Sequence, residues 1–419
     1  MPGLIIGLTG AFGSGCSFLA ENFLKEFEQF SLSKILKEAY LQEKGVEADQ
    51  RELLQEFGDE IRDQDRGGAS DKLAQMLFEN MKDPTTQTVD VTNRNIVIDS
   101  IRNPAEIQFF REKWPNFILM AVFADKAKRW GRVNEKYNDS HDTFNRDDQR
   151  DSGYGEPEHG QQVKKCFFQA DIVIANNEEI NPRSEKQNAY IGMRSKIEDC
   201  LSALTDPLHS SPTAEEIAMA VAYTVGRNSK CKQRKVGAVI VDAEHNILSS
   251  GFNHVPPGLE DCESKYGYCY RKWYREKDLT KRFKKLLEND ISPDRIDGIS
   301  LAMANSVKML ELCRSMHAEE NAIMNMVGRS SSIGIAKRET EDKPENGLKA
   351  PKCVTLFATT YPCNLCANKI VKSGIKKVVY FEPYPVEEAK QILEKGQVIS
   401  IPFEGVTFRA FFKAYQYWS

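Results

Sequence analysis

The sequence has no long apolar stretch and no pattern of an N-terminal leader. No run approaches the roughly 20 apolar residues that a membrane-spanning helix needs. Residues 1–10 lack the basic segment of a signal peptide and have the pattern of a buried strand. These absences predict a cytoplasmic protein that makes no membrane contact.

Positive charge is not in excess either. The chain has 57 Lys and Arg against 61 Asp and Glu, which gives a formal net charge of -4. Proteins that bind a nucleic-acid polymer usually carry a basic surface along it. The charge balance therefore favours a small anionic ligand, such as a free nucleotide, because a local group of cations is enough to hold it.

Cysteine is too sparse for a disulfide framework, since ten cysteines occur in 419 residues. We expect free thiols and metal ligands instead. The chain is too long for one ordinary core, and its hydrophobic content of 41% is enough for two or three packed domains.

Two short motifs carry the most specific chemistry: His-Ala-Glu at 317–319 and Pro-Cys-Asn-Leu-Cys at 362–366. This combination is the signature of zinc deaminases that act on nucleobases. Cys363 and Cys366 lie on one face of a helical turn, and His317 adds a third ligand from a second helix. A fourth tetrahedral position stays open for water, which is typical of catalytic rather than structural zinc.

The residues beside these ligands fit the same interpretation. Pro362 suits the first turn of a helix, which places both cysteines near a helix N-terminus, where the dipole favours thiolate. Glu319 is two residues from His317 and can move a proton from water to a ring nitrogen and to the departing amine. A structural Cys/His zinc site and a Cys-x-x-Cys redox pair are the alternatives.

Near the start, an apolar run at 4–9 leads into a glycine-rich segment and then a helical pattern at 18–27. Strand, glycine loop and helix are the context of a phosphate-binding loop. The nucleotide-binding candidates are Gly10, Gly13, Ser14, Gly15, Cys16 and Ser17. Ser17 can reach Mg²⁺, whereas Cys16 stands where lysine is usual, which argues against catalysis of phosphate transfer. A glycine-rich turn without a ligand is the alternative.

Further strand-like runs at 95–99, 117–123 and 170–177 alternate with helical segments, which predicts a doubly wound parallel α/β sheet. The series resembles P-loop nucleoside-monophosphate and dephospho-coenzyme-A kinases. That resemblance places Asp99 and Arg102 near the nucleotide. It also implies four candidates for a basic lid, Arg129, Arg132, Arg146 and Arg150. A solvated helix face is the other interpretation of these arginines.

The domain boundary is expected where turn-forming residues gather. Residues 138–160 are polar and are expected to form a mobile loop, and residues 205–212 contain two prolines and resemble a linker. We therefore expect a first domain at 1–205 and a second at 213–419. In the second domain a capped helix is followed by strand patterns at 236–241, 247–251, 353–358 and 377–381. These elements predict an α/β/α sandwich.

Six segments of the second domain resemble, in order, the deoxycytidylate (dCMP) deaminase family. They are Ser229-Lys230-Cys231, residues 236–241, Gly251-Phe252-Asn253, residues 317–323, residues 362–366 and residues 373–380. With a P-loop domain in front, the architecture is similar to the anti-phage deoxycytidylate deaminases of the DcdV or AvcD type. The expected fold is a P-loop doubly wound sheet followed by a cytidine-deaminase-like α/β/α sandwich.

The resemblance implies deamination of dCMP and dCTP to dUMP and dUTP, which drains dCTP during phage infection. It also implies a regulatory P-loop domain, a small inhibitory RNA as partner, and homo-oligomers, commonly hexamers. By the same resemblance His317, Cys363 and Cys366 are the zinc ligands and Glu319 is the proton shuttle. The implied substrate contacts are Asn253 and Asn321. The basic loop at 227–234, which contains Ser229 and Arg234, is expected to bind the phosphate because it places several cations beside the first strand. A solvated loop is the alternative interpretation.

Two insertions depart from the family pattern. Residues 328–352 separate the zinc motifs, and residues 261–299 are rich in aromatic and basic side chains. Four cysteines resemble those that hold a second, structural zinc in some of these deaminases: Cys231, Cys262, Cys269 and Cys313. Separate buried thiols are the alternative.

Two other functions are compatible with parts of the sequence. A deaminase of tRNA or single-stranded DNA would need cations and aromatic rings along a strand path, which only residues 266–275 could supply. A binding protein with a decayed deaminase domain is the second, and the intact set of His, Glu, Cys and Cys argues against it. Activity on free dCMP with none on oligonucleotides would exclude the first.

Overall fold

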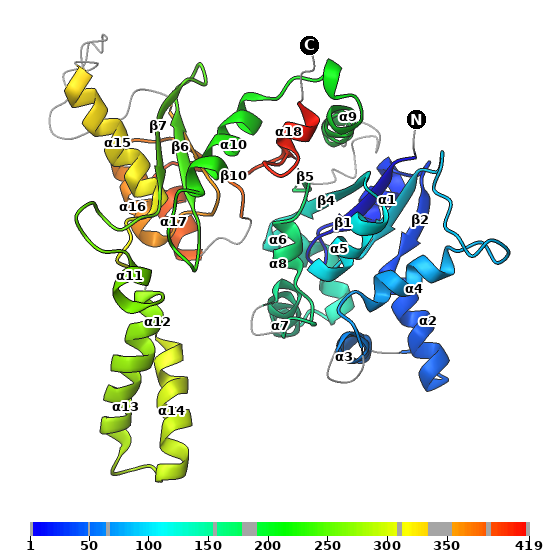
Figure 1. Ribbon diagram of the computed structural model, residues 1–419, viewed down its shortest axis with the longest axis horizontal. Coiled ribbons are helices and arrows are strands. Elements are labelled where there is room, and N and C mark those ends of the chain that lie inside the picture. The colour runs from blue at the N-terminus through cyan, green and yellow to red at the C-terminus, as the bar shows by residue number, and fades with distance from the viewer. Residues whose placement is uncertain are drawn as a thin grey trace. The chain divides into compact units, whose positions relative to one another are not determined.

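The computed structural model describes residues 3–48, 51–63, 68–153, 157–177, 191–307, 312–333, 354–382 and 387–415. The chain forms two compact units. Residues 1–212 and 404–419 make the first, and residues 213–403 make the second. Each unit is a sheet with helices packed around it (Figure 1). Within the described ranges no helix is both long and apolar enough to span a bilayer.

The first unit is built on a six-stranded mixed sheet in the order β11-β5-β4-β1-β3-β2. Its strands are β1 (Ile5–Thr9), β2 (Glu28–Ser31), β3 (Ile96–Asp99), β4 (Phe117–Phe123), β5 (Ile172–Ala175) and β11 (Gly405–Val406). Strands β1 to β5 are parallel, and β11 pairs antiparallel with β5. Every residue of β1, β3 and β4 is buried, as expected where helices cover both faces of a parallel sheet.

The glycine-rich segment lies at the carboxyl end of β1, where it joins this strand to helix α1 (Cys16–Phe23). The other helices of this unit are α2 (Leu32–Lys44), α3 (Arg51–Arg62), α4 (Lys72–Asn80), α5 (Pro104–Lys113), α6 (Lys126–Val133), α7 (His141–Ser152), α8 (Val163–Phe167), α9 (Ile191–Thr205) and α18 (Phe411–Ala414), with 3₁₀ turns η2 (Asn134–Tyr137) and η3 (Pro207–His209). Alternate residues of the central strands, such as Leu8 and Met120, pack against α1 and α9. The carboxyl edge of such a sheet is where ligands bind in open α/β folds.

Residues 138–160 were expected to form a loop, and this prediction is wrong because they contain α7. Ser140 caps this helix, since its Oγ atom accepts the N–H of Thr143. Phe144 is buried against the rings of Trp130 and Tyr137. The buried carboxylates of Asp147, which accepts from the hydroxyl of Tyr137, and Asp151, which pairs with Arg102, hold the other turns of this helix on the first unit.

The last residues of the chain belong to the first unit, whereas the second domain was expected to run to residue 419. The hydroxyl of Thr407 donates to the carbonyl oxygen of Ala170, and the N–H of Ala175 donates to Glu404. These partners lie 237 and 229 positions apart. Pairing over such a distance leaves no local pattern in the sequence, which is why the sequence did not predict it. The second unit ends at residue 403.

The second unit contains a five-stranded mixed sheet in the order β10-β9-β8-β6-β7. Its strands are β6 (Gly237–Val241), β7 (Ile247–Phe252), β8 (Thr355–Ala358), β9 (Lys377–Tyr380) and β10 (Ile399–Pro402). Strand β6 runs antiparallel to both β7 and β8, and β8, β9 and β10 are parallel. The flanking helices are α10 (Ala214–Gly226), α15 (Ala318–Ile333), α16 (Asn364–Ser373) and α17 (Glu387–Lys395).

Alternate residues of β6 show that α10 and α15 cover opposite faces of this sheet. A Cβ atom at Gly237 would lie 1.8 Å from the carbonyl oxygen of Ala222, so Gly237 faces α10 at very close range. The next residue, Ala238, belongs with Ile240 to the core cluster that contains Ala318 of α15. The arrangement is the layered helix, sheet and helix structure that the sequence predicts.

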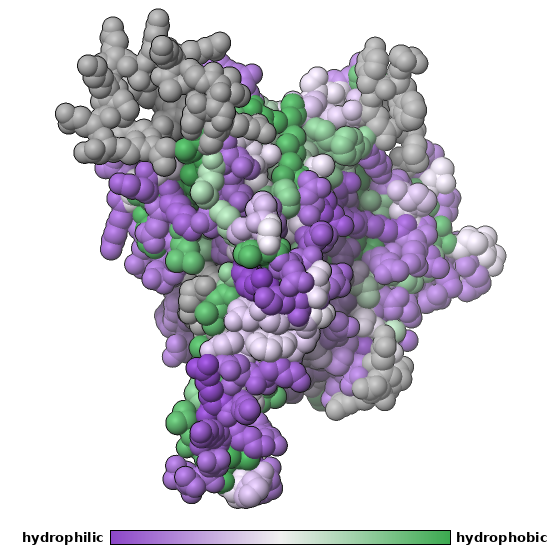
Figure 2. Space-filling model, turned by 60° about the vertical axis from the view of Figure 1, so that its left-hand side comes forward, coloured by the Kyte–Doolittle hydropathy of each residue, from purple (hydrophilic) through white to green (hydrophobic). Residues whose placement is uncertain are grey.

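The insertion after β7 forms a helical hairpin. Its elements are α11 (Cys262–Tyr266), α12 (Tyr270–Tyr274), a π-helical turn η4 (Arg275–Leu279), α13 (Thr280–Leu287) and α14 (Pro293–Ser306). Helices α13 and α14 lie side by side and extend away from the sheet of this unit (Figure 1). Figure 2 shows this end as mostly hydrophilic, although Leu286 and Leu301 are exposed on it. Most of the other insertion, 328–352, lies outside the described residues.

We expect Gly237→Ala to destabilise the second unit. The added methyl group would meet the Ala222 carbonyl oxygen, so β6 and α10 would have to separate, at a cost of about 1–3 kcal/mol. Gly298→Ala is the matched control, because in α14 its methyl group meets nothing within 4 Å and should add about 0.5–1 kcal/mol of stability. Denaturant unfolding measures both variants, and equal midpoints would contradict this packing.

Candidate active site

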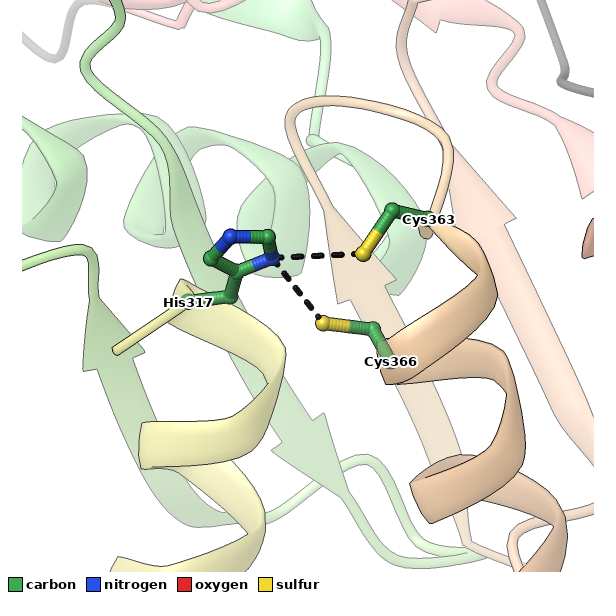
Figure 3. A group of neighbouring side chains, drawn as sticks. All are labelled: His317, Cys363 and Cys366. Atoms are coloured by element: carbon green, nitrogen blue, oxygen red, sulfur yellow. Dashed lines mark hydrogen bonds between the residues drawn. The ribbon is translucent and has the colours of Figure 1, made fainter. Parts of the chain in front are cut away.

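Three side chains that can bind a metal ion converge in the second unit. His317 lies immediately before α15, and Cys363 and Cys366 lie at the start of α16 (Figure 3). The Nδ1 atom of His317 is 3.3 Å from the sulfur of Cys363 and 3.4 Å from that of Cys366. The three ligand atoms lie within 4.8 Å of one another, and across the described ranges no other His, Cys, Asp or Glu side chains form such a group.

The start of α16 explains why the two sulfurs lie together. Cys363 is the N-cap of this helix, and Cys366 is the third helical residue. Pro362 was expected in the first turn, but it precedes the cap by one residue. Unpaired N–H groups and the helix dipole at this end favour negative charge, which suits a thiolate.

Hydrogen bonds within the group separate the pKa values of its members. A hydrogen bond from Cys366, supported by one from His317, lowers the pKa of Cys363 to about 4. Hydrogen bonds with Cys313 and Cys363 raise the pKa of His317 to about 10. Interaction with Cys363, together with burial, raises the pKa of Cys366. The group therefore contains one ready thiolate and protons that a metal ion would displace on binding.

This donor set fits zinc. Two sulfur atoms and one imidazole nitrogen are ligands that tetrahedral Zn²⁺ takes, and three protein ligands are typical of a catalytic site. Glu319 adjoins the group from the first turn of α15 without being part of it, and it is 2% exposed. Burial raises the pKa of Glu319. A carboxyl group so placed can exchange a proton with a reacting molecule while the metal keeps its own ligands.

The predicted polar contacts of the substrate are buried and hold the walls of the site. Asn253 fixes the basic loop, because its Nδ2 donates to the carbonyl oxygen of Arg234 at 2.9 Å. Ser229 donates to the carbonyl oxygen of Asn253 at 2.7 Å, and Asn321 donates to that of Phe252 at 2.9 Å. All three side chains thus position backbone around the site, and their direct contact with a sugar stays a prediction.

Arg234 has two partners that the sequence analysis missed. Its guanidinium pairs with Glu382 and donates to the hydroxyl of Thr360 at 3.2 Å, and that hydroxyl donates to Glu382 at 2.5 Å. Glu382 is 3% exposed. Both partners follow the carboxyl ends of the parallel strands β8 and β9. Polar residues directly after neighbouring strands are the signal that could have found them.

The four additional cysteines, Cys231, Cys262, Cys269 and Cys313, line one cavity of about 320 Å³. All four are described, and no three of them bring their sulfur atoms within 4.8 Å of one another. Cys313 interacts with the site instead: burial opposes its ionisation, but a hydrogen bond with His317 lowers the pKa of Cys313. The second zinc therefore stays a prediction, because binding would require these thiols to move together.

The glycine-rich segment of the first unit borders a separate cavity of about 660 Å³, together with Asp99 and Arg102. Gly15 has a φ of 101°, and a Cβ atom there would lie 2.3 Å from the Nδ2 of Asn176. Ser17 Oγ donates to Asp99 at 2.6 Å. Burial, aided by Asp99, raises the pKa of Cys16 to about 12, so this thiol stays neutral.

Two of the four arginines expected to form a lid, Arg129 and Arg132, support the protein around the glycine loop instead. Arg129 is buried and pairs with Asp148 at 2.6 Å. Arg132 donates to the carbonyl oxygen of Gly13 at 3.3 Å. None of the four candidates borders the cavity, neither these two nor Arg146 and Arg150. The sequence of a basic helix does not show whether its cations bind phosphates or oxygen atoms of the protein. Here Arg129 and Arg132 bind oxygen atoms of the protein.

Known proteins match part of this chain, and the matching family model falls almost wholly within the second unit. Residues 212–382 match the family model for the cytidine and deoxycytidylate deaminase zinc-binding region. The deoxycytidylate deaminase of Enterobacteria phage T4 is 32% identical over 166 residues, which are 39% of this chain and 75% of that protein. The deoxycytidylate deaminase of Enterobacteria phage T2 is 31% identical over 164 residues, 39% of this chain and 77% of that protein. Among solved structures, the dCMP deaminase of cyanophage S-TIM5 in complex with dCMP and dUMP has a TM-score of 0.28 and 23% identity, covering 46% of this chain and 100% of that chain.

The site and these matches define a deaminase, an enzyme of the hydrolase class that acts on nucleotides. The chain belongs to the cytidine and deoxycytidylate deaminase family. The zinc-binding region of that family implies Zn²⁺ as the metal. In the described part of the chain, the group formed by His317, Cys363 and Cys366 is the one that fits it.

We expect Cys363→Ser and Cys366→Ser to lose zinc. Replacing a thiolate by a hydroxyl removes a ligand, which should weaken zinc binding by more than about 100-fold, beyond the loss seen for residues that only support a ligand. Cys200→Ser is the control, because Cys200 is buried in the first unit. Elemental analysis after dialysis against a chelator measures bound zinc. Equal retention in all three variants would contradict this assignment.

Proposed function

We propose that the protein catalyses zinc-dependent hydrolytic deamination of free deoxycytidine nucleotides, converting dCMP and dCTP to dUMP and dUTP. The observation that carries the proposal is the convergence of His317, Cys363 and Cys366 beside the buried carboxyl group of Glu319. The relatives at 31% and 32% identity are deoxycytidylate deaminases by name, which supports a deoxycytidine nucleotide as substrate.

Glu319 moves protons in the proposed reaction. Zn²⁺ held by the three ligands supplies Lewis-acid chemistry that makes water acidic. Glu319 accepts a proton from the attacking water and delivers it to N3 of the cytosine ring. The water oxygen forms a bond to C4, and Glu319 then takes the second proton from this oxygen. The bond from C4 to the amino nitrogen breaks as Glu319 passes that proton to the nitrogen and the C4 carbonyl group forms. Cytosine and water thus give uracil and ammonia.

A free nucleotide is favoured over a polynucleotide by the packing of the aromatic insertion. Tyr266 lies 4.9 Å from Tyr270 and 5.1 Å from Trp273 between ring centroids, and Tyr270 stacks on Trp273. Rings that pack on one another offer few open faces to successive bases, which a single-strand binder needs. The small negative net charge points the same way.

The first unit is proposed to bind a nucleotide at the glycine loop and to regulate the deaminase. The cavity beside the start of α1 and the contact between Ser17 and Asp99 suit a phosphate with Mg²⁺. Cys16 in place of lysine supports binding without phosphate transfer. In the anti-phage role that the family resemblance implies, the reaction would drain dCTP, a small RNA would inhibit it, and the subunits would form a homo-oligomer such as a hexamer.

Glu319→Gln should abolish turnover of dCMP and dCTP. Loss of the proton carrier is expected to lower kcat by about 100- to 10,000-fold. Glu320→Gln is the matched control, because that neighbour pairs with Lys369 at 2.7 Å and takes no part in the proposed chemistry. An ammonia-release assay would compare dCMP, dCTP, deoxycytidine and a cytosine-containing oligonucleotide. Turnover of the oligonucleotide alone would overturn the proposal.

Gly15→Ala should weaken nucleotide binding to the first unit by at least about 10-fold, because its methyl group would strike Asn176 and deform the loop. Gly45→Ala is the control: it has a similar positive φ at the end of α2, but a methyl group there meets nothing within 4 Å. Equilibrium dialysis with labelled ATP, GTP and dTTP measures binding. Equal affinity in both variants, or no binding by the unaltered protein, would contradict the proposed phosphate site.

A further inference from the structure

The cavity lined by the four cysteines also contains more cations than acids. Two of the cations are neutralised by near neighbours: Lys230 lies 3.6 Å from Asp261, and Lys232 lies 3.1 Å from Glu263. Two arginines remain, Arg271 of α12 and Arg314. This cavity therefore has a net positive charge that internal ion pairs do not cancel.

The two arginines differ in what holds them. Arg314 lies over the ring of Tyr266, 5.3 Å from the ring centroid, and its Nη1 atom is buried without a hydrogen-bond partner. Arg271 has no ion pair and no side-chain hydrogen bond with any of the described residues, although it is only partly exposed. Guanidinium groups that line a cavity without an acidic partner are suited to an anion that arrives from outside.

The cavity that Arg271 lines adjoins the catalytic group, because it is also lined by Phe252 and His254, on either side of Asn253, and by Ser315, two residues before His317. The charge of Arg271 acts on Arg234, whose pKa is lowered by burial and further by this charge, while Glu319 opposes this. Its charge also acts on Cys313, which is hydrogen-bonded to His317. The charge of Arg271 therefore reaches Arg234, which interacts with Glu319, and Cys313, which interacts with His317.

Arg234 cannot by itself balance a phosphate. Its guanidinium is paired with the buried carboxylate of Glu382, so its positive charge is already compensated. A phosphate monoester carries nearly two negative charges at neutral pH. Another cation is needed, and Arg271, which lines the cavity beside the basic loop and has no ion pair with the described residues, can supply it.

We propose that Arg271 is a specificity-determining residue that binds the phosphate groups of the deoxycytidine nucleotide. This inference rests on the proposed function and extends the substrate site into the insertion, because α12 supplies the residue. The planar guanidinium can form two parallel hydrogen bonds to phosphate oxygens, which a nucleoside lacks. Arg271 thereby makes the enzyme select nucleotides over deoxycytidine.

The test compares Arg271→Gln, Arg271→Lys and Lys272→Gln in steady-state assays on dCTP, dCMP and deoxycytidine. Arg271→Gln should lower kcat/KM for both nucleotides by about 10- to 100-fold, mainly through KM, and leave deoxycytidine unchanged. Arg271→Lys should recover part of the loss. Lys272→Gln removes the same charge one residue further on, from an exposed side chain near Glu276, and should behave like the unaltered enzyme.

Binding to the Glu319→Gln protein provides a readout that does not depend on turnover. Adding Arg271→Gln should weaken dCMP and dCTP binding in calorimetry by the same factor, with bound zinc unchanged. Equal losses for deoxycytidine and dCMP, or a loss of zinc, would overturn the inference and indicate a structural role. Failure of the proposed function looks different, since the unaltered enzyme would then deaminate no deoxycytidine substrate.

Discussion

The second unit depends on holding two thiols and an imidazole close together at the ends of two helices. His317 and Cys363 are 46 residues apart in sequence, yet their ligand atoms are 3.3 Å apart. Two ionised thiols so close together would repel each other, so they share a proton unless a metal ion binds. The lowered pKa of Cys363 and the raised pKa of Cys366 reflect that sharing. A metal ion held by His317, Cys363 and Cys366 would replace these protons and link α15 to α16, so metal binding would add to the stability of the unit.

Neutral hydrogen bonds fix the backbone around the site, and an ion pair fixes the charged side chain of Arg234 on that backbone. Ser229, Asn253 and Asn321 are all buried and bind backbone carbonyl groups. The basic loop is therefore in place before any ligand arrives. Glu382 then fixes the guanidinium of Arg234. Holding these groups in position in advance lowers the entropy that substrate binding must remove.

The sequence was informative wherever a feature is local. Apolar runs located β1 and β4, and the spacing of Cys363 and Cys366 predicted neighbouring sulfur atoms. The expected helix at 18–27 ends at Phe23, and the missed strand β2 is a short polar strand at the edge of the sheet. Edge strands carry a weak pattern because only part of their surface is buried. Only the fold brings Glu382 to Arg234, because the sequence between them spans most of the unit.

The insertion helps to explain how a departure from a family pattern can become part of its site. The cavity receives side chains from the first part of the insertion, up to Arg271, and none from α13 or α14. Yet α12, the π-helical turn and α13 follow one another without a break, and α14 packs along α13. A single turn of helix would fray in water, since short helices are marginal on their own. The hairpin continues α12 into a longer helix that packs along α14, which steadies the backbone that carries Arg271.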